Sequence, residues 1–188
     1  MKKQIAILGS TGSIGTQALE VIAENPDLFE VYALTANNSD QLLIEQARKF
    51  QPEIVVIAND KKYEIVKDAL KDLPIKVFAG SQSIAEVAEM EPVDIVLTAM
   101  VGYSGLQPTI HALNAGKTIA LANKETLVVA GDLICDLAKK NRCAILPVDS
   151  EPHKGDPNMV PPIVSLKTGL YCNIVCKNCL HTSICLLL

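Results

Sequence analysis

The fold of this chain is decided by residues 5–15, which read IAILGSTGSIG. The apolar run at residues 5–8, closed by a glycine, is typical of a buried strand. Apolar residues at helical spacing follow the last glycine, and an Asn-Pro pair at residues 25 and 26 ends that pattern, so we predict a helix there. The three glycines therefore lie in a strand-to-helix turn.

Gly9, Gly12 and Gly15 make this turn suitable for binding phosphate. Gly9 permits the tight turn, Gly12 lets a pyrophosphate approach the backbone, and Gly15 lets the helix pack closely on the strand. The backbone amides of the first helical turn, at the positive end of the helix dipole, would then face the phosphates. Because the spacing is G-x-x-G-x-x-G and not G-x-G-x-x-G, a purely structural Gly/Ser turn is the alternative.

Hydroxyl groups in the same turn would add hydrogen-bond donors to a bound phosphate. The three candidates are Ser10, Thr11 and Ser13. The turn follows the first strand of a strand–helix series, and this position favours nucleotide binding over the structural alternative.

The chain up to residue 151 repeats a strand–helix pattern. The expected strands are apolar on both faces, as parallel strands covered by helices must be. Amphipathic segments lie between them, which indicates a doubly wound, mostly parallel, Rossmann-like α/β sheet with ligands beyond the carboxyl ends of the strands. The expected strands are Gln4–Leu8, Glu30–Thr35, Glu53–Ala58, Ile75–Phe78, Asp94–Thr98, Lys117–Leu121 and Cys143–Val148.

Composition excludes several classes of function. The net charge is −4 and no basic run is present, which argues against nucleic acid as a partner. The sequence lacks an apolar run long enough to cross a membrane. The first expected strand begins at once, which leaves no room for a signal peptide, so we expect a cytoplasmic protein with reduced cysteines.

The chain changes character at residue 152. Of the 21 Asp and Glu residues, 20 precede it, whereas four of the six cysteines follow it. We therefore expect one domain over residues 1–151 and a Cys- and Pro-rich tail over residues 152–188, irregular or disordered and not a domain. Cysteines 172, 176 and 179 have a spacing that resembles the iron–sulfur-binding loop of radical S-adenosylmethionine enzymes, and a zinc site is also conceivable. Chance cysteines are favoured, because too few residues follow to build the barrel that surrounds this loop in those enzymes.

The second strand is expected to end near residues 34–39, and the last three of these are Asn37-Asn38-Ser39. An NAD-specific fold usually has an Asp or Glu at this position, which binds the ribose 2′-hydroxyl. A carboxylate there would repel a 2′-phosphate, so its absence favours NADP over NAD. A plain polar turn is the alternative.

Two later strand ends carry polar side chains at the rim of the expected crevice. In an extended segment, residues two apart point the same way, so Asp149 and Glu151 can converge on one hard cation. Lys124 could bind a substrate phosphate. Solvated loop charges and helix caps are the alternatives. The two segments are Asn123-Lys124-Glu125 and Asp149-Ser150-Glu151.

Five motifs together resemble one family. They occur in the order and spacing found in 1-deoxy-D-xylulose 5-phosphate reductoisomerases, and the match covers residues 1–151. The resemblance implies an NADPH-dependent enzyme that makes 2-C-methyl-D-erythritol 4-phosphate in non-mevalonate isoprenoid synthesis. It also implies a homodimer whose subunits have an NADPH domain, a catalytic domain and a C-terminal helical domain. The motifs are residues 9–15, Ala99-Met100-Val101-Gly102, Ala115-Gly116-Lys117, residues 121–125 and residues 147–151.

The resemblance also assigns cofactor-binding residues. The glycine turn would bind the pyrophosphate, the polar segment after the second strand would hold the adenosine ribose and its 2′-phosphate, and two residues of the later rim would lie at the cofactor. These residues are Gly9, Thr11, Gly12, Ser13 and Ile14, then Asn37, Asn38 and Ser39, and finally Asn123 and Glu125.

The catalytic and metal-binding residues implied by the resemblance lie at the last two strand ends. Lys124 and Ser150 would contact the sugar-phosphate substrate. Asp149 and Glu151 would ligate Mg²⁺ or Mn²⁺, and Glu151 thereby belongs to the catalytic set with Lys124 and Ser150. The ion would polarise the substrate's C–O bonds for rearrangement to an aldehyde, which NADPH then reduces.

The resemblance stops at residue 151. The family's third metal-binding carboxylate, its substrate-phosphate residues and its lid have no counterpart in the tail, so we expect a truncated or frameshifted product without activity. Dimerisation is not expected of such a chain, since the catalytic domain supplies much of the family's interface. The alternative functions are a non-catalytic NADPH-binding module, including a broken gene product, and an unrelated NAD(P) dehydrogenase.

Overall fold

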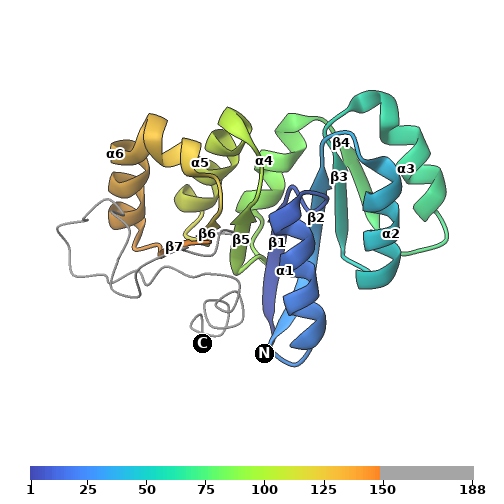
Figure 1. Ribbon diagram of the computed structural model, residues 1–188. Coiled ribbons are helices and arrows are strands. Elements are labelled where there is room, and N and C mark those ends of the chain that lie inside the picture. Colours follow the sequence, from blue (N-terminus) through green and yellow to red (C-terminus); the bar gives the residue numbers. More distant parts are fainter. Residues whose placement is uncertain (149–188) are drawn as a thin grey trace, which may run out of the picture.

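The computed structural model describes residues 1–148, and the seven strands in this part of the chain form one parallel sheet (Figure 1). The sheet order is β4-β3-β2-β1-β5-β6-β7. Each strand predicted from apolar runs is confirmed, with ends displaced by at most two residues. The bounds are β1 Lys3–Leu8, β2 Phe29–Ala36, β3 Ile54–Ile57, β4 Lys76–Ala79, β5 Ile95–Thr98, β6 Thr118–Leu121 and β7 Ile145–Pro147.

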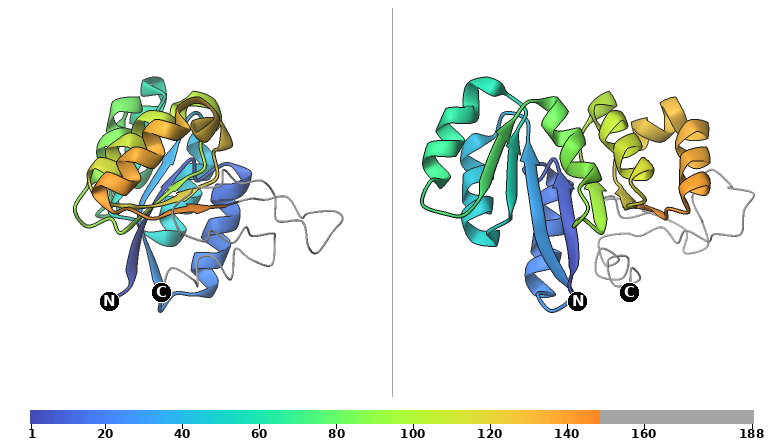
Figure 2. Two further views of the ribbon diagram at one scale, coloured as in Figure 1. Left: turned by 90° about the vertical axis from the view of Figure 1, so that its left-hand side faces the viewer. Right: turned by 180° about the vertical axis from the view of Figure 1, so that it is seen from behind.

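Helices cover both faces of the sheet (Figure 2). Buried side chains of α1, α2 and α3 form a core on one face, and those of α4, α5 and α6 form a second core on the other. The doubly wound α/β fold is therefore confirmed, whereas the expected tail lies outside the described residues. The helices are α1 Ser13–Glu24, α2 Asp40–Phe50, α3 Tyr63–Leu70, α4 Ser81–Glu89, α5 Leu106–Asn114 and α6 Lys124–Asn141, with 3₁₀ turns η1 Asp60–Lys62 and η2 Gly102–Gly105.

The strand order places a crevice beside β1. From β1 the chain builds outward to β4, returns through α4 to β5 on the other side of β1, and then builds outward to β7. In open α/β sheets, ligands bind beyond the carboxyl ends of the strands where this order reverses. The loops after β1, β2 and β5 therefore lie where ligands bind in folds of this type.

One extra residue interrupts the pairing of β1 with β2. Ile5 pairs with Val31, but Ala6 pairs with Ala33, so Tyr32 is the inserted residue. Tyr32 and Ala33 both pack against the core on the α4–α6 face, so the usual alternation of side chains changes phase at this point. Beyond the insertion, Thr35 is paired with Leu8, directly beside the glycine turn.

Gly9 and Gly15 are required by close backbone approaches. Gly9 has a φ of 88°, and a Cβ there would lie 2.8 Å from the carbonyl oxygen of Ala99, in the loop after β5. A Cβ at residue 15 would meet the carbonyl oxygen of Gly9 and would lie 2.6 Å from Cα of Ser10. The predicted reasons for these two glycines, a turn and close helix packing, are confirmed.

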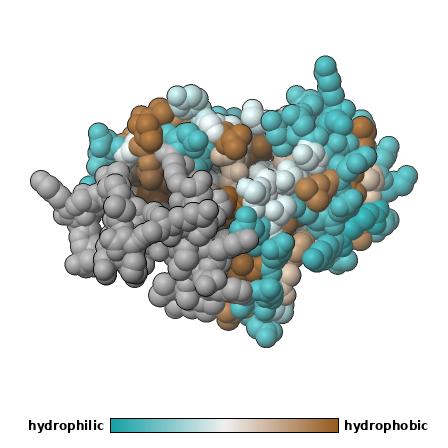
Figure 3. Space-filling model, viewed as in Figure 1, coloured by the Kyte–Doolittle hydropathy of each residue, from teal (hydrophilic) through white to brown (hydrophobic). Residues whose placement is uncertain are grey.

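The two ends of the molecule differ in surface character. Apolar surface is visible at the α6 end in Figure 3, whereas the surface over α2 and α3 is mostly hydrophilic. On α6, Val128 is 84%, Val129 52% and Leu133 50% exposed. Among residues 1–148, no helix has the length and apolar character that crossing a membrane requires.

We expect Gly15→Ala to lower the free energy of unfolding by about 3 kcal/mol, because the new methyl group would overlap backbone atoms that cannot move independently of the sheet. Urea unfolding of the full chain, followed by circular dichroism, measures this change. The matched control is Gly131→Ala in α6, where a Cβ meets nothing within 4 Å. That control should be neutral or stabilising by about 1 kcal/mol. Equal effects at the two positions would contradict the packing argument.

Candidate functional site

The candidate site is the carboxyl edge of the sheet around β1, where the glycine turn meets the end of β2. The backbone amides of Gly9 and Ser10 both donate to the carbonyl oxygen of Thr35, at 3.1 and 2.8 Å. The amide of Gly9 also lies 3.1 Å from the Thr35 hydroxyl oxygen. Gly12 closes the turn by donating to the carbonyl oxygen of Gly9 at 3.1 Å. The turn is therefore fixed to β2 before any ligand binds.

Ser10 faces the interior, so the prediction that its hydroxyl faces a phosphate is wrong. Ser10 is fully buried, and its Oγ donates to Oε1 of Gln46 at 2.7 Å. In return, Nε2 of Gln46 donates to the carbonyl oxygen of Ser10 at 2.9 Å. This reciprocal pair holds the glycine turn against α2 and satisfies the buried amide of Gln46, while the Ser10 hydroxyl also lies 3.3 Å from the carbonyl oxygen of Thr35.

Sequence reasoning missed Gln46, although the sequence contains a signal for it. Leu43, Gln46 and Ala47 are spaced as one helix face, and all three are buried. A glutamine on an apolar helix face needs a hydrogen-bond partner inside the fold. The position of that partner, however, becomes visible only when β1 and α2 are packed together.

The rest of the glycine turn is open to a ligand. Gly12 and Ser13 are exposed, whereas Thr11 and Ile14 are half-buried. Gly12 is the N-cap of α1, and among the described residues no side chain caps this helix. The first amides of α1 have no partner within the helix and lie at the positive end of its dipole, so an anion can accept from them. Cofactor binding by these residues stays a prediction.

The segment after β2 is polar and exposed, as predicted. Asn37, Asn38 and Ser39 all face solvent, and Ser39 is the N-cap of α2. The loop after β3 supports them: Asn59 donates from its backbone amide to the carbonyl oxygen of Asn37 at 3.1 Å and from Nδ2 to Oδ1 of Asn38 at 2.8 Å. The following residue, Asp40, begins α2.

Asn123 joins the ends of β5 and β6. Its Nδ2 donates to the carbonyl oxygens of Met100 and Gly102, at 2.6 and 2.7 Å, and its Oδ1 accepts from the amide of Thr126 at 3.2 Å. The predicted helix cap is confirmed. A contact between this side chain, which is only 3% exposed, and a cofactor would come in addition to these bonds.

The other residues predicted at the later rim are described only in part. Glu125 is exposed in the first turn of α6, and Lys124 begins that helix. The predicted metal ligands Asp149 and Glu151, and Ser150 between them, lie outside the described residues. So do the tail cysteines. Within residues 1–148, no three His, Cys, Asp or Glu side chains are grouped to hold a metal ion.

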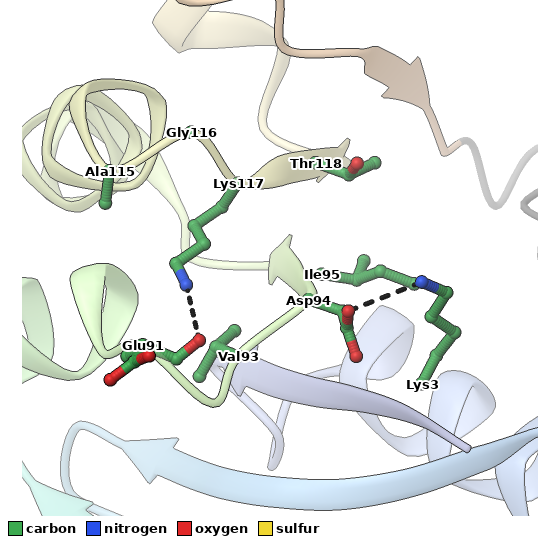
Figure 4. A pocket seen from close by; sticks show the side chains of 9 residues that line it. All are labelled: Lys3, Glu91, Val93, Asp94, Ile95, Ala115, Gly116, Lys117 and Thr118. Atoms are coloured by element: carbon green, nitrogen blue, oxygen red, sulfur yellow. Dashed lines mark hydrogen bonds and ion pairs between the residues drawn. The ribbon is translucent and has the colours of Figure 1, made fainter. Parts of the chain in front are cut away.

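A pocket of about 350 Å³ lies at the opposite edge of the sheet, by the amino ends of β5 and β6 (Figure 4). Three of its charged side chains bond within the fold. Nζ of Lys117 donates to the carbonyl oxygen of Glu91 at 2.9 Å, and Lys3 forms an ion pair with Asp94 at 3.3 Å. Burial lowers the pKa of Lys117. This pocket is remote from the glycine turn, so we assign it no part in the candidate site.

The parallel sheet, the glycine turn at the point where strand order reverses and the open helix N-terminus define the class: a Rossmann-like domain of the dinucleotide-binding type. A family model described as 1-deoxy-D-xylulose 5-phosphate reductoisomerase matches residues 5–131. The chain belongs to the 1-deoxy-D-xylulose 5-phosphate reductoisomerase family.

Individual relatives agree with the family model. The 1-deoxy-D-xylulose 5-phosphate reductoisomerase of Phocaeicola vulgatus is 68% identical over 151 residues, which cover 80% of this chain and 40% of that protein. The Bacteroides thetaiotaomicron protein of the same name is 70% identical over 150 residues, 80% of this chain and 38% of that protein. The chain thus spans about 40% of the length of the curated relatives it matches.

Solved structures give the same result. The reductoisomerase from Zymomonas mobilis in complex with NADPH superposes with a TM-score of 0.77 at 39% identity, over 80% of this chain and 40% of that chain. A reductoisomerase structure in complex with NADPH, fosmidomycin and magnesium superposes with a TM-score of 0.75, also at 39% identity, over 79% of this chain and 36% of that one.

We expect Gln46→Met, which keeps the side-chain volume but removes the reciprocal hydrogen bonds, to lower the free energy of unfolding by about 2 kcal/mol. The loss comes from the buried hydroxyl and carbonyl of Ser10, which no longer have this partner. Urea unfolding measures the change. Gln41→Met, at an exposed position of the same helix, is the control and should stay within about 0.5 kcal/mol of the unmodified chain. If Gln46→Met lowered the free energy of unfolding no more than Gln41→Met, the stabilising role of the Ser10–Gln46 pair would be contradicted.

Proposed function

We propose that residues 1–148 bind NADPH at the carboxyl edge of the sheet. In this proposal the pyrophosphate lies against Gly12, Ser13 and the first turn of α1, and the 2′-phosphate lies against Asn37–Ser39. The nicotinamide then extends toward the ends of β5 and β6. When bound, NADPH supplies a hydride, and the chain's own part is to position the cofactor and exclude water around it.

The observation that carries this proposal is the shape of the glycine turn. The turn is fixed to β2 through Thr35 and to α2 through Gln46, while its exposed residues and the uncapped start of α1 face outward. Such a turn needs no rearrangement to accept a pyrophosphate. The carboxylate-free end of β2 supports NADPH over NADH.

For the whole protein we infer the family's reaction, conversion of 1-deoxy-D-xylulose 5-phosphate to 2-C-methyl-D-erythritol 4-phosphate, with a sugar phosphate as substrate. Support comes from two relatives that are 68% and 70% identical to this chain within the matched region, which covers 40% and 38% of their lengths. Mg²⁺ or Mn²⁺ at Asp149 and Glu151 and a homodimer of the full-length enzyme are further proposals implied by the family resemblance, and a cytoplasmic location is a prediction from the sequence.

A second candidate is a cofactor-binding module without chemistry. The matched region spans 40% and 38% of these two relatives, so activity of this part alone is a separate question from activity of the family. For a polypeptide of the printed sequence we therefore expect NADPH binding without turnover. NADPH oxidation followed by absorbance, with 1-deoxy-D-xylulose 5-phosphate and Mg²⁺, tests this expectation. Turnover at the rate of a full-length relative would establish the first candidate for this chain itself.

Ser13→Asp separates binding from folding. A carboxylate in the first turn of α1 would repel the pyrophosphate, so we expect at least about a tenfold loss of NADPH affinity. The same carboxylate interacts favourably with the helix dipole, which stabilises the fold by about 0.5 kcal/mol, so the free energy of unfolding should not fall. Fluorescence titration measures the affinity and urea unfolding the stability. Ser81→Asp, the same change at the first residue of α4, is the control and should bind NADPH normally. Normal binding by Ser13→Asp would place the cofactor elsewhere.

A further inference from the structure

A positive charge lies at the start of α2, directly after the segment Asn37–Ser39, which itself contains no Lys or Arg. Lys62, the last residue of η1, follows β3 and donates from Nζ to Oδ1 of Asp40 at 2.9 Å. Asp40 is the first residue of α2, directly after Ser39. The lysine comes from the loop after β3, so the residues directly after β2 carry no sign of it.

The loops after β2 and β3 form one hydrogen-bonded unit. Besides its two bonds to the β2 segment, Asn59 caps η1 by accepting from the amide of Lys61 at 3.0 Å. The amide of Lys62 donates to the carbonyl oxygen of Asn59 at 2.9 Å, and the amide of Asp40 donates to the carbonyl oxygen of Asn38 at 3.0 Å. The backbones that carry Lys62 and Asp40 are therefore both tied to the segment at which a 2′-phosphate would bind.

The two charges of the pair have opposite effects on a phosphate at this position. The side chain of Asp40 is 14% exposed, and the hydrogen bond from Lys62 lowers the pKa of its carboxyl, so it is ionised at neutral pH. An ionised carboxylate one residue beyond Ser39 would repel a 2′-phosphate. Lys62 offsets that charge, and its ammonium has three N–H donors, of which Asp40 accepts one. The remaining donors can bond to a phosphate oxygen.

We propose that Lys62 is a specificity-determining residue that binds the ribose 2′-phosphate of NADPH, and that Asp40 holds its ammonium in place while opposing the same phosphate. The inference rests on the proposed binding of NADPH. It assigns the preference for NADPH over NADH to a lysine of the β3 loop, where the fold more commonly uses a residue directly after β2.

The test compares NADPH and NADH affinities of the full chain by fluorescence titration. For Lys62→Met we expect about a tenfold loss of NADPH affinity, since one charge-assisted contact is lost and Asp40 is left uncompensated. NADH, which lacks the 2′-phosphate, should change less than about twofold. For Asp40→Asn we expect NADPH affinity to rise about threefold with NADH unchanged. The control is Lys61→Met, at the exposed neighbour, with a change below about twofold for both cofactors.

The opposite signs distinguish this function from a purely structural ion pair. If the pair only stabilised the two loops, the affinities for NADPH and NADH would both fall in Lys62→Met and in Asp40→Asn. That result would overturn the inference. Lys62→Arg keeps the charge, so it should retain the preference for NADPH, and it serves as the second variant if Lys62→Met folds poorly. Loss of the preference in Lys62→Arg, with the preference kept in every other variant, would also overturn the inference. An unmodified chain that binds neither cofactor overturns the proposed function itself.

Discussion

The contact between the start of α1 and the glycine turn is the constraint on which the candidate site depends. Two backbone segments meet at Gly15 with no room for a side chain. Since the interior around β1 is close-packed, this contact fixes the direction of α1 and therefore the direction of its dipole. Gly9 adds a second such contact, against the loop after β5. The site is thus shaped by backbone packing in the core, and its exposed residues are presented by that packing.

Side chains from elsewhere in the chain then join the strand ends to one another. Gln46 connects the end of β1 to α2, Asn59 connects the ends of β2 and β3, and Asn123 connects those of β5 and β6. The nitrogen of each amide donates to a neighbouring loop, and Gln46 also accepts from that loop with its oxygen. The oxygens of Asn59 and Asn123 instead cap the helical turns that follow them, η1 and α6. Sites held by such supporting contacts keep their geometry without a ligand, which lowers the ordering cost of binding.

The strands and the role of the glycines could be predicted because their causes are local: apolar runs, helical spacing and turn residues. The direction of Ser10 could not, because it depends on where α2 packs. The same holds for Lys62, which meets Asp40 only because the pairing of β2 with β3 brings their following loops together. Asp149 and Glu151 remain predictions from the sequence and the family resemblance.

Because Tyr32 is an inserted residue, the number of residues in β2 determines where Thr35 lies relative to the glycine turn. Before it, Phe29 and Val31 face the α1–α3 core, and after it Leu34 and Ala36 do so, a pattern that plain alternation cannot give. Removing one residue there would turn one half of the strand over and carry Thr35 away from the amides that it accepts. Insertions and deletions should therefore be tolerated in surface loops but not in β2, even where the remaining side chains of the strand stay hydrophobic.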